Sequence, residues 1–227
     1  MPSILAFDTA TATGSVAVLH QGRCVSHTEP MPREHSQRML PLIDCLLQEA
    51  GVELLSLDAI AFTHGPGSFM GVRLATGFAQ GLAFGADIPV IPLSTLQVLA
   101  QTAYATHGVK RVLAAWDARM DSLYWGGYVC DAEGVMQPVL PDALTRADAW
   151  VWPGDSWNCV GNAWSVYPSA LPEMPEAIKR GDLECVPDAE AMLTLAQARL
   201  LTQTTTSPLT VEPLYLRNQV AHEPKHS

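Results

Sequence analysis

The chain has 227 residues, of which 48% are hydrophobic and 16% charged, and its formal net charge is −10. This composition is typical of a folded globular protein and excludes a disordered chain, while the acidic charge disfavours direct, tight binding to a nucleic-acid backbone. Five scattered cysteines form no Cys-x-x-Cys pair, and no apolar run suits a signal peptide or a membrane span, so we expect a cytoplasmic protein without a disulfide framework.

Strand-like runs occur in two similar sets. Apolar runs separated by turn residues cover 3–9, 15–19 and 23–28, and a second set covers 111–116, 123–130 and 135–140. The first run of each set leads to an aspartate, Asp8 in one and Asp117 in the other. This repetition predicts an α/β fold of two halves, each a β-meander followed by helices. We place the first half at residues 1–108 and a reduced second half, with a C-terminal tail, at 109–227.

Residues 35–50 have helical periodicity, with apolar residues that share one face at Leu40, Ile43, Leu46, Leu47 and Ala50. Pro41 either starts or kinks this helix, and Gly51 is suited to end it. In the second half we expect a short helix at 143–149, a loop at 168–187 and a clear helix at 188–203. A Thr- and Pro-rich span at 202–213 then leads to an extended tail, with disorder at 222–227.

A glycine-rich turn follows the strand that contains Phe62. Gly65, Gly67 and Gly71 permit close backbone approach, and Ser68 is suited to cap the next helix. Because a helix start has free N–H groups, the turn is either an anion site or an ordinary strand-to-helix connection. It is not a Walker A loop, since no Gly-Lys-Ser/Thr follows.

The predicted helix at 69–84 contains an unusual stripe of glycines. Gly77, Gly81 and Gly85 recur every four residues, although glycine inside a helix costs about 1 kcal/mol relative to alanine. The stripe therefore indicates a packing role, either against a partner helix or against the chain's own sheet. A second stripe is predicted to face the core and consists of Leu74, Phe78 and Leu82.

Three segments in this region resemble the bacterial TsaB (YeaZ) family of threonylcarbamoyladenosine biosynthesis proteins. They are Gly-Pro-Gly-Ser-Phe-Met-Gly-Val-Arg (65–73), Ala-Gln-Gly-Leu-Ala-Phe-Gly (79–85) and Ser-Thr-Leu-Gln (94–97). Further similar segments follow the family's order at 7–11, 14–18, 35–37, 40–41, 117–120, 124–128 and 215–221. Each segment alone is weak, whereas the ordered set covers nearly the whole chain and is specific.

The resemblance implies an actin-like ATPase (RNase H-like) fold with a cleft between its halves. It makes Asp8, Thr9, Thr11 and Asp117 candidates for weak binding of ATP or ADP with magnesium, whereas the chemistry of the residues alone favours Asp8 as a turn aspartate that bonds its own backbone. Gly161 with Asn162 gives only a faint likeness to an adenosine-binding Gly-x-Gly motif.

Catalytic relatives of this family, TsaD among them, carry a metal-binding His-x-x-x-His pair on a helix. The matching positions here are Ser94 and Val98, which cannot chelate a metal. No nucleophilic triad is apparent either. We therefore predict no catalytic residues and no metal site in this chain.

Two functions remain open at this point. The resemblance implies a non-catalytic scaffold subunit that forms a heterodimer with TsaD, works with TsaE and meets tRNA only through the complex, without any membrane contact. The same surface would allow a homodimer, and the predicted partner interface consists of His35, Met39, Ile43, Phe69, Arg73, Gly77 and Gly81. The alternative is an independent actin-fold ATPase or phosphotransferase that uses Asp8 and Asp117.

Overall fold

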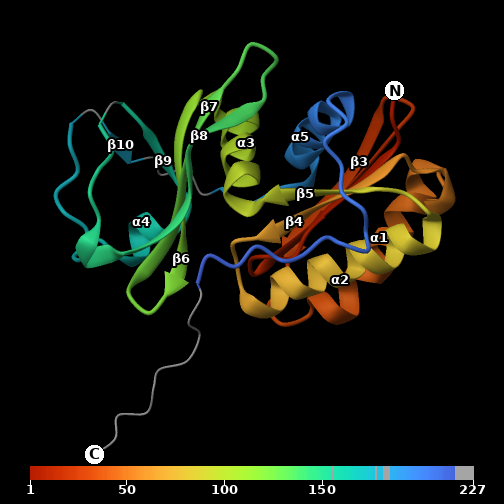
Figure 1. The fold of residues 1–227 in the computed structure, drawn as a ribbon, viewed down its shortest axis with the longest axis horizontal. Helices are drawn as coiled ribbons and strands as arrows, with labels where there is room; N and C mark the ends of the chain where they lie inside the picture. Colours follow the sequence, from red (N-terminus) through yellow and green to blue (C-terminus); the bar gives the residue numbers. More distant parts are fainter. Residues whose placement is uncertain (155, 177, 181–184, 218–227) are drawn as a thin grey trace, which may run out of the picture.

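The computed structural model describes residues 1–154, 156–176, 178–180 and 185–217, which form two five-stranded sheets with helices around them (Figure 1). The first sheet contains β1 (Ile4–Asp8), β2 (Thr13–His20), β3 (Arg23–Pro30), β4 (Ala59–Gly65) and β5 (Val90–Ser94). The second contains β6 (Arg111–Arg119), β7 (Ser122–Cys130), β8 (Met136–Arg146), β9 (Asn158–Val160) and β10 (Lys179–Arg180). The helices are α1 (His35–Ala50), α2 (Phe69–Ala86), α3 (Thr95–His107), α4 (Ala163–Val166) and α5 (Ala189–Leu201).

Both sheets repeat one topology. The first has the strand order β3-β2-β1-β4-β5, and the second has the corresponding order β8-β7-β6-β9-β10. In each, the first strand pairs antiparallel with the second and parallel with the fourth, so that β1 lies between β2 and β4, and β6 lies between β7 and β9. This repeated order confirms the predicted duplication of a β-meander half.

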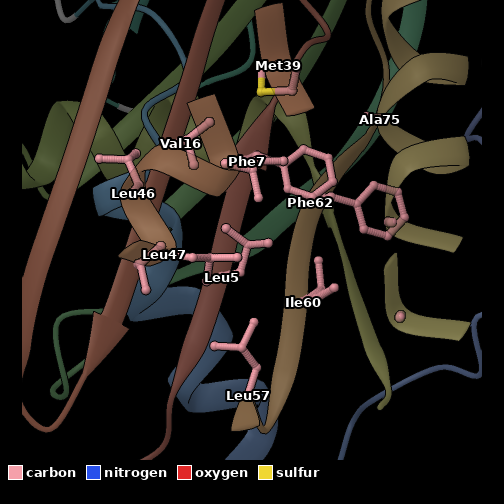
Figure 2. Close-up of a cluster of buried hydrophobic side chains, with 14 of the residues drawn as sticks. Leu5, Phe7, Val16, Met39, Leu46, Leu47, Leu57, Ile60, Phe62 and Ala75 are labelled. Atoms are coloured by element: carbon pink, nitrogen blue, oxygen red, sulfur yellow. The ribbon is translucent and has the colours of Figure 1, made fainter. Parts of the chain in front are cut away.

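Side chains along each strand of the first sheet point alternately to its two faces, and helices cover both faces. Leu5 and Phe7 point to the side of α1 and α2, where Phe7 packs against Phe62 with ring centroids 6.3 Å apart (Figure 2). Ile4 and Ala6 point to the opposite side, which α3 and α5 cover (Figure 1). Both faces are therefore apolar, as a sheet between two helix layers requires.

Helix α5 comes from the C-terminal part of the chain but packs on the first sheet. Met192 and Leu195 contact the cluster around Ile4, and the Ala189 N–H donates to Ser15 Oγ at 2.8 Å. The segment 109–217 therefore does not pack as a separate unit. The division of the chain at 108/109 stays a prediction about sequence repetition.

The second sheet has α3 on its inner face and a tryptophan cluster on its outer face, where a longer helix would otherwise lie. Trp150 is central to this cluster, with ring centroids 5.0 Å from Trp125 and 5.5 Å from Trp164. The helix expected at 143–149 is wrong, because residues 143–146 extend β8 and pair with β7, and only Ala147–Ala149 form a 3-10 turn. Cross-strand pairing outweighs the local helix propensity there.

Helix α1 has the predicted bounds and ends as expected at Gly51, whose φ of 70° is left-handed. Its core face differs from the prediction by one position. Leu40 is 41% exposed, whereas His35 and Met39 are buried together with Ile43, Leu46 and Leu47. Two adjacent apolar residues, Met39 and Leu40, made the helical phase ambiguous from sequence.

Helix α2 presents alanines to the sheet and glycines away from it. The Ser68 side chain caps the helix by accepting from the Gly71 N–H at 3.1 Å, as predicted. The buried face consists of Gly71, Val72, Ala75, Thr76, Ala79 and Ala83. The stripe of Leu74, Phe78 and Leu82, predicted to face the core, is only half-buried. A Cβ built at Gly77, Gly81 or Gly85 would meet nothing within 4 Å, so these glycines are not needed for packing within the chain.

Two further expectations concern the rest of the chain. Of the predicted loop at 168–187, residues 177 and 181–184 lie outside the described residues, and Lys179–Arg180 form the short β10. The expected disorder at 222–227 also lies outside the described residues. Within the described part of the chain, none of the helices combines the length and apolarity needed to cross a bilayer.

We predict opposite effects of alanine at two glycines of α2. A Cβ at Gly71 would lie 2.0 Å from the carbonyl oxygen of Thr9, so Gly71→Ala should lower the free energy of unfolding by about 2–4 kcal/mol. Gly77→Ala meets open space and should raise it by up to about 1 kcal/mol. Chemical denaturation followed by circular dichroism measures both, and equal effects at the two positions would contradict the packing.

Candidate functional site

A cavity of about 880 Å³ lies between the two halves, where the β1–β2 and β6–β7 turns face each other. The first turn contributes Ala10, Thr11 and Ala12, and the second contributes Ala118, Arg119 and Met120. The start of α2 and the C-terminal residues Leu214, Tyr215 and Arg217 close the remaining sides. This is the position at which the sequence predicts a nucleotide site.

Asp8 is sealed beneath this cavity and does not line it. The side chain is fully buried, and its Oδ1 accepts hydrogen bonds from the Thr63 hydroxyl and, at 3.0 Å, from the Ala10 N–H. Oδ2 has no hydrogen-bond partner in the described part of the chain. Burial raises the pKa of Asp8 from its ordinary value of 3.8 to about 7, against the lowering effect of those two hydrogen bonds. The geometry is that of a turn aspartate bonding its own backbone.

Thr9 and Thr11 also bond to the backbone. The Thr9 hydroxyl donates to the Gly71 carbonyl at 2.7 Å, and the Thr11 hydroxyl lies 3.3 Å from the Thr13 carbonyl. The glycine-rich turn packs directly on this loop, since the Ser68 N–H donates to the Ala10 carbonyl at 2.8 Å. The turn therefore acts as a close-packed connection against the first loop.

Asp117 lies on the other side of the cavity, and its negative charge is already compensated by groups of the chain itself. It accepts from the Arg119 backbone N–H at 2.8 Å, from the Arg119 guanidinium at 3.0 Å and from the Tyr167 hydroxyl. Burial and the hydrogen bond to Asp117 together raise the pKa of Tyr167 to about 12. The nearby Asn162 side chain accepts from the Asp117 N–H at 2.8 Å, which fixes the loop after β9.

These residues do not fit a magnesium–nucleotide complex. Magnesium needs an accessible carboxylate, whereas Asp8 is sealed and Asp117 is held by an arginine and a tyrosine. The backbone N–H groups of Ala10 and Arg119, which a phosphate would use, bond to these same aspartates. Among the described residues, no group of three or more His, Cys, Asp or Glu side chains is placed to hold a metal ion.

Ser94 and Val98 are fixed by the fold. The Ser94 oxygen caps α3 by accepting from the Leu96 and Gln97 N–H groups at 3.2 and 3.4 Å, and its hydroxyl donates to Asp142. Tyr128 donates to the same carboxylate, and burial raises the pKa of Asp142. Val98 is fully buried against the first sheet. One position thus starts a helix and the other fills the core.

The predicted partner residues divide into two groups. Phe69, Arg73, Gly77 and Gly81 are exposed on one side of α2. His35, Met39 and Ile43 are buried under α1, with only 7%, 0% and 2% of their surface exposed, so they are not available to a partner in this structure. The interface assignment of the exposed group stays a prediction.

The exposed side of α2 is larger than the sequence interpretation allowed. Met70 and Phe84 are 64% and 67% exposed, and each lies seven residues from Gly77, which places it on the same side of a helix. The seven-residue spacing is the sequence signal that indicates this shared side. We call this side the α2 outer face, made of Phe69, Met70, Arg73, Gly77, Gly81, Phe84 and Gly85. Leu40 of the neighbouring α1 is also exposed.

Comparisons with known proteins agree along nearly the whole chain. Residues 29–225 match the sequence model of the family described as TsaD, tRNA N6-adenosine threonylcarbamoyltransferase. The chain is 40% identical to the tRNA threonylcarbamoyladenosine biosynthesis protein TsaB of Escherichia coli K12, over 96% of each chain. It is 39% identical to the TsaB protein of Haemophilus influenzae, over 96% of this chain and 94% of that relative.

Among solved structures, YeaZ from Pseudomonas aeruginosa is similar, with a TM-score of 0.87 and 43% identity over 95% of this chain and 100% of that one. Together with the duplicated sheets, these matches confirm the predicted actin-like (RNase H-like) α/β fold.

We predict that Asp8 makes stability fall as pH rises. The folded state keeps its proton to about pH 7 while the unfolded chain loses it near 3.8, so ionisation in this window favours the unfolded state by up to about 4 kcal/mol. Asp8→Asn should therefore be less stable relative to wild type at pH 5 than at pH 8. Urea unfolding of both proteins across this range measures the difference, in which other titrating groups cancel. If the stabilities of the two proteins changed in parallel with pH, the raised pKa of the buried Asp8 carboxyl would be contradicted.

Proposed function

We propose a function for this chain from the premise that it belongs to the TsaB family of tRNA threonylcarbamoyladenosine biosynthesis proteins. It takes part in the biosynthesis of this tRNA modification. Its particular role in that process is the subject of the proposal.

The role we propose is that of a non-catalytic accessory subunit. The chain forms a heterodimer with TsaD, works with TsaE and supports threonylcarbamoyl transfer to the adenosine next to the anticodon. It acts in the cytoplasm, contacts tRNA only as part of the complex and requires no cofactor of its own, binding ATP, ADP and magnesium weakly at most. The net charge of −10 supports the absence of tight direct tRNA binding.

The observation that carries this proposal is the structural use of Ser94 and Val98. These are the positions at which the resemblance expects the metal-binding histidine pair of TsaD. Here Ser94 caps α3 and Val98 is fully buried, so neither side chain faces a site where a metal would be held. The chain thus keeps the fold of a transferase relative while these two positions serve its stability.

The α2 outer face supports the proposed heterodimer. Its glycines lack side chains and have open space in front of them, so a helix of another chain can approach closely. Phe69, Met70 and Phe84 add exposed apolar surface at both ends of the stripe, which marks an interaction site more often than a free surface. A second copy of the chain presents the same face, so a homodimer is the competing assembly when TsaD is scarce.

The second candidate is an independent ATPase or phosphotransferase. It is favoured by the cavity of about 880 Å³ between the two turns, which is large enough for a nucleotide. The sealed Asp8 and the compensated Asp117 argue against it. Nucleotide turnover by the isolated chain distinguishes the two candidates.

We predict that the purified chain alone forms no threonylcarbamoyladenosine, and that addition of TsaD and TsaE produces it. Transfer to tRNA with threonine, bicarbonate and ATP, followed by mass spectrometry of the nucleosides, measures this. Calorimetric titration of the isolated chain with ATP and magnesium should show weak or no binding. Product formation by the chain alone, or tight ATP binding that Asp8→Ala abolishes, would contradict the accessory role.

We predict that Gly81→Leu prevents heterodimer formation without unfolding the chain. The leucine side chain would project from the α2 outer face into open space, so the monomer keeps its fold while a partner helix is displaced. Gly81→Ala is the matched control and should still bind, because a methyl group adds little bulk. Size-exclusion chromatography with TsaD and thermal unfolding test both variants. Full complex formation by Gly81→Leu would place the interface elsewhere.

A further inference from the structure

Arg73 on the α2 outer face is held in one orientation by two aromatic rings. Its guanidinium carbon lies 3.5 Å from the ring centroid of Phe69 and 5.6 Å from that of Tyr215. Its Nε donates to the Tyr215 hydroxyl at 2.8 Å. The ring centroids of Phe69 and Tyr215 are 6.4 Å apart. An arginine that is stacked and bonded in this way loses less side-chain freedom when it binds an anion.

Tyr215 belongs to a C-terminal strap, residues 202–217, that is itself anchored to both halves. Figure 1 shows the strap in blue beside α2 on its way to the second sheet. Thr206 pairs with Val90 of β5, and the Leu214 N–H donates to the His64 carbonyl at 2.7 Å. Arg217 then donates to the Ala118 and Arg119 carbonyls at 3.3 and 3.2 Å. Tyr215, whose hydroxyl bonds Arg73, thus lies between two anchored residues of the strap, Leu214 and Arg217.

The strap also explains why Gly65 precedes α2. A Cβ at this residue would lie 2.7 Å from the Leu214 carbonyl oxygen, and its φ of 120° is one that side chains rarely adopt. The strap backbone therefore lies against the glycine-rich turn, one residue before Tyr215.

The charge of Arg73 is not neutralised within the described part of the chain. Some exposed arginines have acidic partners, such as Arg38 with Glu29 and Arg146 with Asp148. Among the described residues, no carboxylate lies within ion-pair distance of Arg73, and no hydrogen bond engages its two terminal nitrogens. A guanidinium that is held in place at an exposed apolar face, with no carboxylate partner among the described residues, is matched to an anion from another molecule.

We propose that Arg73, positioned by Phe69 and Tyr215, is the contact that recognises a carboxylate side chain of the partner protein, and that the strap is therefore part of the partner surface. This inference rests on the proposed heterodimer. The planar guanidinium matches a carboxylate through two parallel hydrogen bonds, and exposed Phe69 and Met70 beside it exclude water from the pair. A phosphate of RNA is disfavoured because the chain as a whole has a net charge of −10.

The test compares four variants of the full chain for affinity to TsaD by calorimetry at low and moderate salt. Arg73→Met should weaken binding by about tenfold or more, and its remaining affinity should vary less with salt than that of wild type. Arg73→Lys should restore less than half of the lost binding free energy, since an ammonium lacks the paired donors. Tyr215→Phe keeps the ring but removes the hydroxyl, and should weaken binding by about threefold. Arg146→Met removes the same charge from the second half and should bind as wild type does.

The outcomes separate this inference from the proposed function. If wild type does not bind TsaD, the proposed heterodimer fails, and this inference with it. If wild type binds and Arg73→Met binds equally well, the heterodimer stands and the role of Arg73 is overturned. If Arg73→Met leaves the heterodimer intact but weakens tRNA binding by the assembled complex, the guanidinium contacts phosphate and the carboxylate proposal is wrong. Thermal unfolding checks that each variant is folded. If Arg73→Met is not folded, Tyr215→Phe still tests the proposal, because it removes only the hydroxyl that positions Arg73.

Discussion

The structure depends on a backbone contact between the loop after β1 and the first turn of α2. A Cβ at Gly71 would lie 2.0 Å from the Thr9 carbonyl oxygen, and one at Gly67 would lie 2.7 Å from that of Ala10. Only glycine permits this approach. The contact fixes the rotation of α2 about its axis, because every fourth residue after Gly71 follows it onto the sheet. Gly77 and Gly81 each lie two residues from the sheet-facing Ala79, nearly half a turn around the helix, and therefore face outward.

The same contact explains why the cleft and the outer surface have different roles. In this fold the loop after β1 is where a phosphate and its metal would be expected, but here the glycine-rich turn packs against that loop, with the Ser68 N–H donating to the Ala10 carbonyl. Asp8 is left behind the loop, fully buried, and bonded to Thr63 and Ala10. The Asp8 carboxylate is therefore not accessible from the cleft, while the outer side of α2, where Tyr215 of the strap bonds Arg73, is exposed.

Local signals in the sequence were sufficient for much of the fold. The cap at Ser68, the stop at Gly51 and the duplicated meanders follow from short-range patterns that the structure confirms. The sequence predictions were wrong where contacts between residues distant in the sequence determine the local structure. Residues 143–146 join a strand because β7 lies beside them, and no local pattern shows that the tail returns to place Tyr215 over Arg73. Of the candidate nucleotide residues, Thr11 and Asp117 line the cleft. Asp8 is buried behind it, and this burial depends on contacts that are distant in sequence.

The central claim is that the chain acts through the α2 outer face. Hydroxyl-radical footprinting of the free chain and of its complex with TsaD tests this directly, because exposed methionine and aromatic side chains report their own accessibility. Met70, Phe69 and Phe84 are exposed in the free chain, as is Val151 in the second half. The account predicts that the complex protects the three α2 side chains and leaves Val151 as reactive as before. Protection of Val151 with unchanged oxidation of Met70 and Phe69 would contradict it.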